Sequence, residues 1–179
     1  MVKRWLCLLL LVMLWVSGCG GEVEWRRFEP DMGGFSALFP GTPEKQTETV
    51  PTAAGTIETV FFLVEQGGMG YSVNLADYPE AYFSESDVEL MLDGAREGAV
   101  LNVGGQLLEE NQITLDGHPG RALKIAVDSA SSPQVEDEFL VHARFYLVGN
   151  RLYVLQAIST EQSSLSPDIE RFLDSFQLE

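Results

Sequence analysis

The stretch FLVHARFYLVGNRLYVLQAI, residues 139–158, places two apolar segments on either side of Gly149 and Asn150. Two turn-forming residues between segments of alternating side chains are typical of a tight β-hairpin. The stretch therefore predicts two paired strands over residues 139–148 and 152–158, and this hairpin is the clearest structural signal in the chain.

The register of this hairpin predicts one apolar face and one mixed face. If Val148 lies opposite Arg151, then Phe145 lies opposite Val154, because antiparallel partners step away from the turn together. One face of the first strand is wholly apolar and carries Phe139, Val141, Ala143, Phe145 and Leu147. The opposite face is mixed and carries His142, Arg144 and Tyr146. Such a sheet needs cover on both sides.

Other segments have the β-branched and aromatic composition or the alternation of strands. They are residues 34–39, 56–64, 71–77, 107–115 and 121–127. The last two flank Asp116-Gly117-His118-Pro119-Gly120, a cluster that predicts the turn of a second hairpin.

Two segments predict helices, and these supply the cover. Ser86-Asp87-Val88-Glu89 has the spacing of a capping box, and apolar residues follow at helical spacing as far as Ala99. Ser166 followed by Pro167 predicts a second helix start, with an apolar stripe over residues 169–176. The sequence thus predicts an α+β fold, with an antiparallel sheet of about six strands and helices packed on both faces.

The N-terminal segment predicts export. Lys3 and Arg4 precede a wholly apolar run over residues 5–16. A helix of that length spans about 18 Å, which is shorter than the hydrocarbon core of about 30 Å. A charged start, a short apolar middle and small residues at the end are the parts of a secretory signal peptide.

The end of this segment, VSGC at residues 16–19, resembles the lipobox of bacterial lipoproteins. The resemblance implies cleavage between Gly18 and Cys19 and acylation of Cys19. An ordinary signal peptide cut nearby and an uncleaved anchor are the alternatives. We expect a signal peptide over 1–18, a lipidated N-terminus with a short linker over 19–27, and a single domain over 28–179.

The charge balance argues against two kinds of partner, nucleic acid and a broad anionic lipid surface. Removing Lys3 and Arg4 from the 11 Lys and Arg leaves 9, against 27 Asp and Glu, a formal charge of −18. Nucleic-acid binding needs a basic face, and a broad contact with anionic lipid needs the same. Cys7 lies in the predicted signal peptide and Cys19 is the predicted lipid site, so the expected mature domain has no disulfide and depends on its core.

Four motifs resemble the Mog1/PsbP-like superfamily, especially its bacterial lipoprotein members, across residues 28–178. They are GFSALFPGTP (34–43), HPGRAL (118–123), GNRLYVLQA (149–157) and RFLDSF (171–176). The resemblance implies an antiparallel sheet with helices on both sides. PsbP-type proteins are accessory or assembly factors of photosystem II in the thylakoid lumen, and Mog1 binds a small GTPase. No catalytic signature accompanies the fold.

The residues of the predicted mature domain suggest no enzyme. It has two histidines, His118 and His142, and no Ser in a G-x-S-x-G context. We therefore expect no catalytic residues and no cofactor. Some PsbP-type relatives bind zinc, which makes Asp116 and His118 candidate ligands, but a pair is fewer than the three or four that zinc sites use. We expect them to bind no metal.

We therefore expect a non-enzymatic, membrane-anchored accessory domain that binds an unidentified protein. It would be tethered through acyl chains to the outer face of the cytoplasmic membrane, or to a periplasmic or lumenal membrane face. In a photosynthetic source the role would be photosystem II assembly. The alternative is a protein that binds a small ligand or divalent cation on the mixed sheet face; a hydrolase is least favoured. A pocket that joins His142, Arg144 and an acidic residue would favour the alternative.

Overall fold

The computed structural model describes residues 23–52, 55–79, 88–128 and 138–179. The predicted signal peptide, the lipobox-like segment and Cys19 lie outside the described residues. So do Ser86 and Asp87, the first half of the predicted capping box.

The described chain is mostly strand. Its strands are β1 Arg26–Phe28, β2 Phe35–Phe39, β3 Glu44–Thr52, β4 Gly55–Gln66, β5 Met69–Asp77, β6 Gln106–Leu115, β7 His118–Val127, β8 Phe139–Val148, β9 Arg151–Thr160 and β10 Gln177–Leu178. Its helices are α1 Val88–Val103, the single 3₁₀ turn η3 Glu161–Ser163 and α2 Pro167–Leu173.

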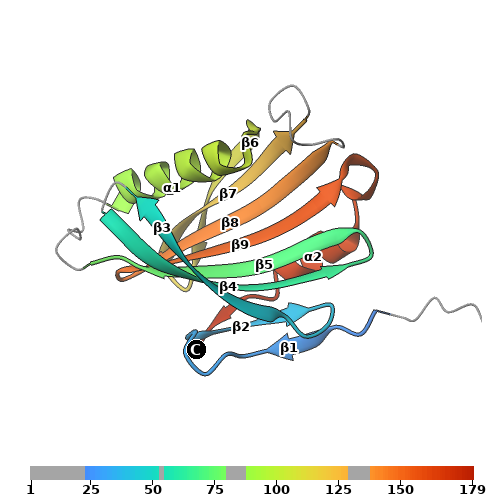
Figure 1. The fold of residues 1–179 in the computed structure, drawn as a ribbon, viewed down its shortest axis with the longest axis horizontal. Helices are drawn as coiled ribbons and strands as arrows, with labels where there is room; N and C mark the ends of the chain where they lie inside the picture. Colours follow the sequence, from blue (N-terminus) through green and yellow to red (C-terminus); the bar gives the residue numbers. More distant parts are fainter. Residues whose placement is uncertain (1–22, 53–54, 80–87, 129–137) are drawn as a thin grey trace, which may run out of the picture.

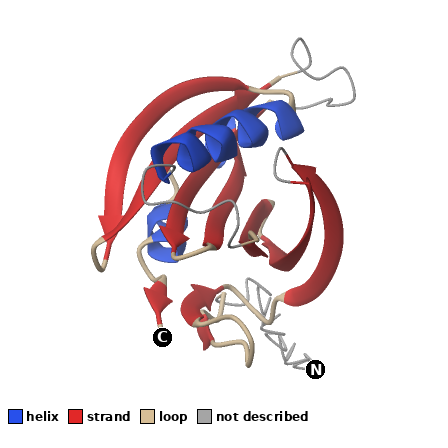
Figure 2. Ribbon diagram, turned by 90° about the vertical axis from the view of Figure 1, so that its left-hand side faces the viewer, coloured by secondary structure: helices blue, strands red, loops and turns tan. Residues whose placement is uncertain are grey.

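Seven strands form one antiparallel sheet in the order β3-β4-β5-β9-β8-β7-β6 (Figure 1). Its centre is the predicted hairpin, now β8 and β9. The predicted register is confirmed: Val148 pairs with Arg151, Phe145 with Val154, and Val141 with Ile158. Figure 2 shows that this sheet is strongly curved.

The expected architecture, about six strands with helices packed on both faces, is wrong. The main sheet has seven strands, and a second sheet adds three in the order β1-β2-β10. Within the described residues only α1 and the short α2 are α-helices, and α2 shares its face of the main sheet with the three-stranded sheet, so neither face carries a layer made of helices alone. The edge strand β3 went unrecognised because EKQTETVPT is polar; its pairing with β4 depends on backbone hydrogen bonds, which composition does not reveal.

The face of the sheet that α1 covers contains an aliphatic core. Leu92 of α1 is completely buried against β7, β8 and the start of β9. The other buried members of this core are Leu123, Ile125, Val127, Val141, Ala143, Phe145, Leu147 and Leu152. The predicted apolar face of β8 is therefore the face that lies against α1.

The opposite face contains an aromatic core, which α2 and the three-stranded sheet cover together. Phe172 of α2 makes edge-to-face contacts with Phe39 and Tyr71, at centroid distances of 5.2 and 5.3 Å. Phe176 stacks on Tyr146 at 5.9 Å. Figure 1 shows α1 and α2 on opposite faces of the main sheet.

Two local predictions need correction. The second hairpin turns at Asp116 and Gly117 alone, both with positive φ, so His118 already belongs to β7 rather than to the turn. The second helix ends at Leu173. Phe176 lies beyond the helix but is still 96% buried, because the chain continues across the same aromatic core.

Candidate ligand groove on the alpha2 side of the sheet

The mixed face of β8 passes from the aromatic core into an open groove. Tyr146 belongs to the core, whereas Arg144 and His142, the next two residues on that face, line a groove of about 430 Å³. We call this the His142 groove. Its lining comprises Glu109, Asn111, Ala122, Leu123, Lys124, His142, Ala143, Arg144, Ser164, Leu165, Ser166, Pro167, Ile169, Glu170 and Leu173.

The floor of the His142 groove is a patch of β6, β7 and β8 whose register places polar groups around one small residue. Lys124 pairs with His142, and Ala122 pairs with Arg144 on β8 and with Asn111 on β6. Directly opposed side chains of an antiparallel pair lie about 5 Å apart. Because the side chain of Ala122 is small, it leaves open space above it. The groups around this space are the Asn111 amide, the Lys124 ammonium, the His142 imidazole and the Arg144 guanidinium.

The wall of the groove is the segment that leads into α2. Ser166 caps the helix, its hydroxyl accepting a hydrogen bond from the Asp168 backbone N–H at 3.3 Å, as the sequence predicted. Leu173 is buried, whereas Leu165 at the rim is 91% exposed. The groove therefore combines a polar floor with an apolar wall.

Arg144 joins this wall to the floor. Its Nη2 lies 2.8 Å from Glu170 Oε2 and 2.7 Å from Asp174 Oδ1, both on the α2 segment. Burial disfavours the charged guanidinium, but the hydrogen bond and negative charge of Asp174, with the charge of Glu170, raise the pKa of Arg144 above its usual value. Arg144 is charged at any pH that the folded protein meets.

His142 and Lys124 are polar groups of the groove without hydrogen bonds to described residues. His142 Nε2 is shielded from solvent and has no partner. Lys124 Nζ approaches Glu109 Oε1 only to 3.9 Å, which is an ion-pair distance but too long for a hydrogen bond. Burial, and then the Lys124 charge, lower the pKa of His142 below that of an ordinary histidine, with Glu170 and Glu109 opposing. The imidazole is therefore neutral at pH 7.

A pocket joining His142, Arg144 and an acidic residue favours the ligand-binding alternative predicted from the sequence. The groove is such a pocket, with Glu170 as the acidic residue. Sequence reasoning missed Lys124, Asn111 and Ala122. The alternation of HPGRALKIAV could have placed Lys124 on one face of its strand. Its pairing with His142 depends on how β7 aligns with β8, and the undescribed residues 129–137 separate those strands in sequence.

The proposed metal candidates lie elsewhere. Asp116 is in the β6–β7 turn, and His118 begins β7 opposite Leu115. Across the described part of the chain, no group of three or more His, Cys, Asp or Glu side chains is placed to hold a metal ion.

The other face of the same strands holds a closed ion network. Arg121, only 6% exposed, contacts Glu89 and Asp93 of α1, and its Nε lies 3.2 Å from Glu110 Oε1 of β6. Leu92 of α1 packs in the core on this same face of the sheet. We interpret this network as structural.

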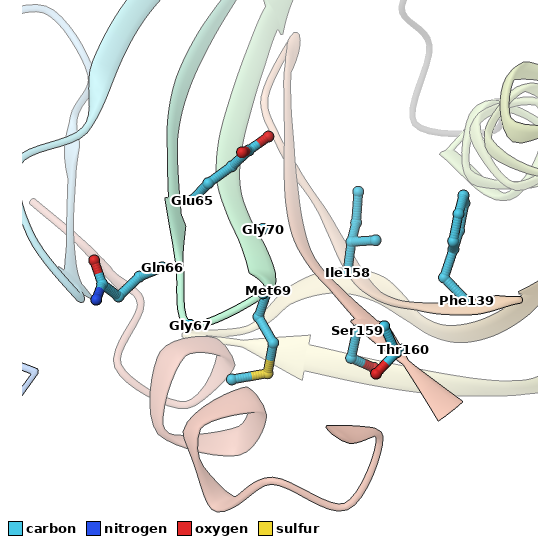
Figure 3. Close-up of a pocket in the computed structure, with 10 residues that line it drawn as sticks. Glu65, Gln66, Gly67, Met69, Gly70, Phe139, Ile158, Ser159 and Thr160 are labelled. Carbon is cyan, nitrogen blue, oxygen red and sulfur yellow. The ribbon is translucent and has the colours of Figure 1, made fainter. Parts of the chain in front are cut away.

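A second depression, of about 440 Å³, lies at the end of the β4–β5 hairpin. Gly70 leaves space between Glu65 and Ile158, its partners on either side. Figure 3 shows Glu65, Ile158 and Phe139 pointing to one side of the sheet and Met69 to the other. The exposed floor offers a single carboxylate, so the depression has fewer converging polar groups than the His142 groove.

No protein-family model matches the chain, and no curated protein matches its sequence. Solved structures do resemble it. Cyanobacterial PsbP (CyanoP) from Synechocystis sp. PCC 6803 has a TM-score of 0.51 at 15% identity, over 93% of this chain and 99% of that chain. The Saccharomyces cerevisiae Ran-binding protein Mog1p has a TM-score of 0.52 at 10% identity, over 88% and 96%.

The resemblance inferred from the four sequence motifs is thus confirmed at the level of the fold, which is PsbP- and Mog1-like. At these identities the likeness concerns the fold alone. None of the helices in the described residues is long and apolar enough to cross a bilayer.

Proposed function

We propose that this protein is an exported, lipid-anchored binding domain without enzymatic activity, which associates with a protein partner at a membrane surface. The surface would be the outer face of the cytoplasmic membrane, or a periplasmic or lumenal membrane face. The shared fold carries this proposal: of the structural neighbours named above, one is described as a Ran-binding protein, and another is a PsbP. In a photosynthetic source, the proposed partner is photosystem II or an assembly intermediate of it.

The positions of the two histidines bear on the enzymatic alternative. Covalent catalysis needs a nucleophile within hydrogen-bond reach of a base that a third group orients. Among described residues, neither His118 nor His142 makes a hydrogen bond to a Ser, Thr or Asp side chain. The strong charge of the predicted mature chain supports a role in which the domain stays soluble above the bilayer.

The anchor is tested by Cys19→Ser, with Cys7→Ser as the matched control in the same leader. We expect Cys19→Ser to remain at precursor size or to appear in the soluble fraction, because it lacks the thiol that carries lipid. Cys7→Ser should be processed and attached like the natural protein. Unchanged size and membrane attachment of Cys19→Ser would refute the lipid anchor.

The binding role is tested by mild detergent extraction of the native membrane, followed by native electrophoresis and affinity purification of the tagged chain. We expect one protein partner to co-purify in a stoichiometric amount and to be captured by chemical cross-linking. The amount of this partner should fall in Cys19→Ser, which lacks the tether. A chain that migrates only as a monomer from its own membrane would contradict the accessory role.

The His142 groove favours a second candidate function, the binding of a small ligand. Its volume of about 430 Å³ lies within the range of small-molecule sites, which is about 300–1,000 Å³. Isothermal titration with small organic acids and amines tests this candidate directly. A groove that binds neither class would remove it and leave the protein-partner role standing.

A further inference from the structure

Two observations define what the His142 groove can recognise. The first is an excess of donors without partners: the groups that make no hydrogen bond to described residues are the Lys124 ammonium, the His142 imidazole and the Asn111 amide. Ammonium donates only, and an amide and an imidazole each supply a donor. A ligand that satisfies these groups must therefore present oxygen acceptors.

The second observation is that the positively charged side chains of the groove are less exposed to solvent than the carboxylates that pair with them. Lys124 is 29% exposed and Arg144 is 21% exposed, whereas their partners Glu109 and Glu170 are 64% and 61% exposed. The cations belong to the floor, and the carboxylates lie toward solvent. An anionic group that enters the groove therefore meets positive charge at the floor, where screening by water is weakest.

The wall limits the rest of the ligand. Leu165 is 91% exposed at the rim and Leu173 lies behind it, so an apolar surface borders the polar floor. Burial of apolar ligand surface against this wall stabilises the complex, because it removes that surface from water. The combination fits a compact molecule with one acidic end and one apolar end.

We propose that the His142 groove binds a small organic acid, with its carboxylate above Ala122 between Lys124, His142 and Asn111, and its apolar part against Leu165. This inference rests on the second candidate function, and it adds the chemical class of the ligand. Arg144 stays paired with Glu170 and Asp174 and so holds the α2 wall in place. In this position its positive charge also adds to the electrostatic field at the floor of the groove.

Histidine NMR of the full chain provides the test, because the sequence contains only two histidines. We use butyrate as the probe and butyramide as its uncharged match, with imidazole carbons labelled. His118 is the internal reference, since it lies six residues along β7 from Lys124, roughly 20 Å away. The charged groups that line the groove with His142 are Lys124, Arg144, Glu109 and Glu170.

Butyrate is expected to shift the His142 resonance and raise the pKa of His142, because a nearby negative charge favours imidazolium. The His118 resonance should move little, and butyramide should shift neither. Equal movement of both histidines, an equal response to butyramide, or no His142 shift with butyrate would overturn the proposal. Tighter binding of inorganic phosphate than of butyrate would overturn the assignment to a carboxylic acid.

Two variants separate recognition from folding. Lys124→Gln should weaken butyrate binding about tenfold, equivalent to about 1.4 kcal/mol, because a charged donor is lost. Ala122→Leu should abolish the His142 response by filling the floor. Lys45→Gln, on the distant edge strand β3, is the matched control and should bind as the natural chain does. Unchanged binding in Lys124→Gln would contradict the proposed contact, and none of these results depends on the lipid anchor or the protein partner.

Discussion

The two α-helices of the described chain are attached to the sheet in different ways. α1 has 16 residues but only one fully buried side chain, Leu92. α2 has seven residues and buries three, Ile169, Phe172 and Leu173. The shorter helix is therefore the more deeply embedded one, and helix length is no guide to how firmly a helix is held.

Each helix is also joined to the sheet by one arginine that reaches two carboxylates four residues apart. Arg121 of β7 contacts Glu89 and Asp93 on the α1 side. Arg144 of β8 contacts Glu170 and Asp174 on the α2 side. The first guanidinium is 6% exposed and the second 21%, because space remains beside Arg144 and becomes the His142 groove. Similar ion pairs can thus close one face and leave the other accessible.

The largest effect should come from the apolar attachment of α2. Phe172→Ala should lower the free energy of unfolding by about 3–5 kcal/mol, because it leaves a cavity in the aromatic core. Leu101→Ala, on the exposed side of α1 at 78% exposure, should change it by less than about 0.5 kcal/mol. Urea denaturation measures both, and similar losses would disprove the contrast between the helices.

The next largest effect should be the difference in stability loss between Arg121→Ala and Arg144→Ala. Arg121→Ala should cost about 3 kcal/mol, because it removes a nearly buried guanidinium that joins Glu89 and Asp93 of α1 to Glu110 of β6. Arg144→Ala should cost about 1 kcal/mol, since its carboxylates are exposed to solvent. Hydrogen exchange should show faster opening of α1 in the first variant only. Equal losses in chemical denaturation would show that burial does not separate the two networks.

The start of α2 should contribute a smaller amount. Ser166→Ala should lower the free energy of unfolding by about 1 kcal/mol, because the Asp168 N–H loses its side-chain acceptor. Ser166→Asp should retain most of the stability as the matched replacement. Thermal unfolding followed by circular dichroism distinguishes these variants, and an unaffected Ser166→Ala would mean that Pro167 and packing alone set the helix start.

The smallest effect should be the pH dependence due to His142. Its pKa is lowered in the folded state, so the unfolded chain binds a proton first as pH falls below about 6.5. Stability should decrease from that pH down to the folded pKa, and His142→Gln should reduce this slope. Urea titrations of the natural chain and of His142→Gln at about pH 7.5, 6.5 and 5.5, settings that span the usual histidine pKa, measure this slope. An unchanged slope in His142→Gln would contradict the assignment.

Prediction from the sequence succeeded where the signal was local. Gly149 and Asn150, with alternation on both sides, predict the β8–β9 register residue by residue. Ser166 and Pro167 predict the start of α2. The edge strand β3 and the short strands β1 and β10 were missed, because polar or very short strands have no periodicity that marks them. The strand predicted over 34–39 is β2, but its pairing with β1 and β10 in a separate sheet was not foreseen.

The candidate site was foreseen only in part. His142 and Arg144 could be placed on the mixed face from alternation, but Lys124, Asn111 and Ala122 reach the same patch through pairing of β6, β7 and β8. Nor does alternation show which end of the mixed face is covered. Tyr146 is buried against Phe176, whereas His142, four residues away on the same strand, borders open space.

By itself, the sequence determined the local elements, the hairpin register and the acidic character of the domain, because turns, alternation and composition act between neighbouring residues. The tertiary structure alone decided the order of the strands, the deep position of Arg121 and the opening beside Arg144. Those features arise from packing between segments far apart along the chain, where the available volume selects which polar groups are enclosed and which remain accessible.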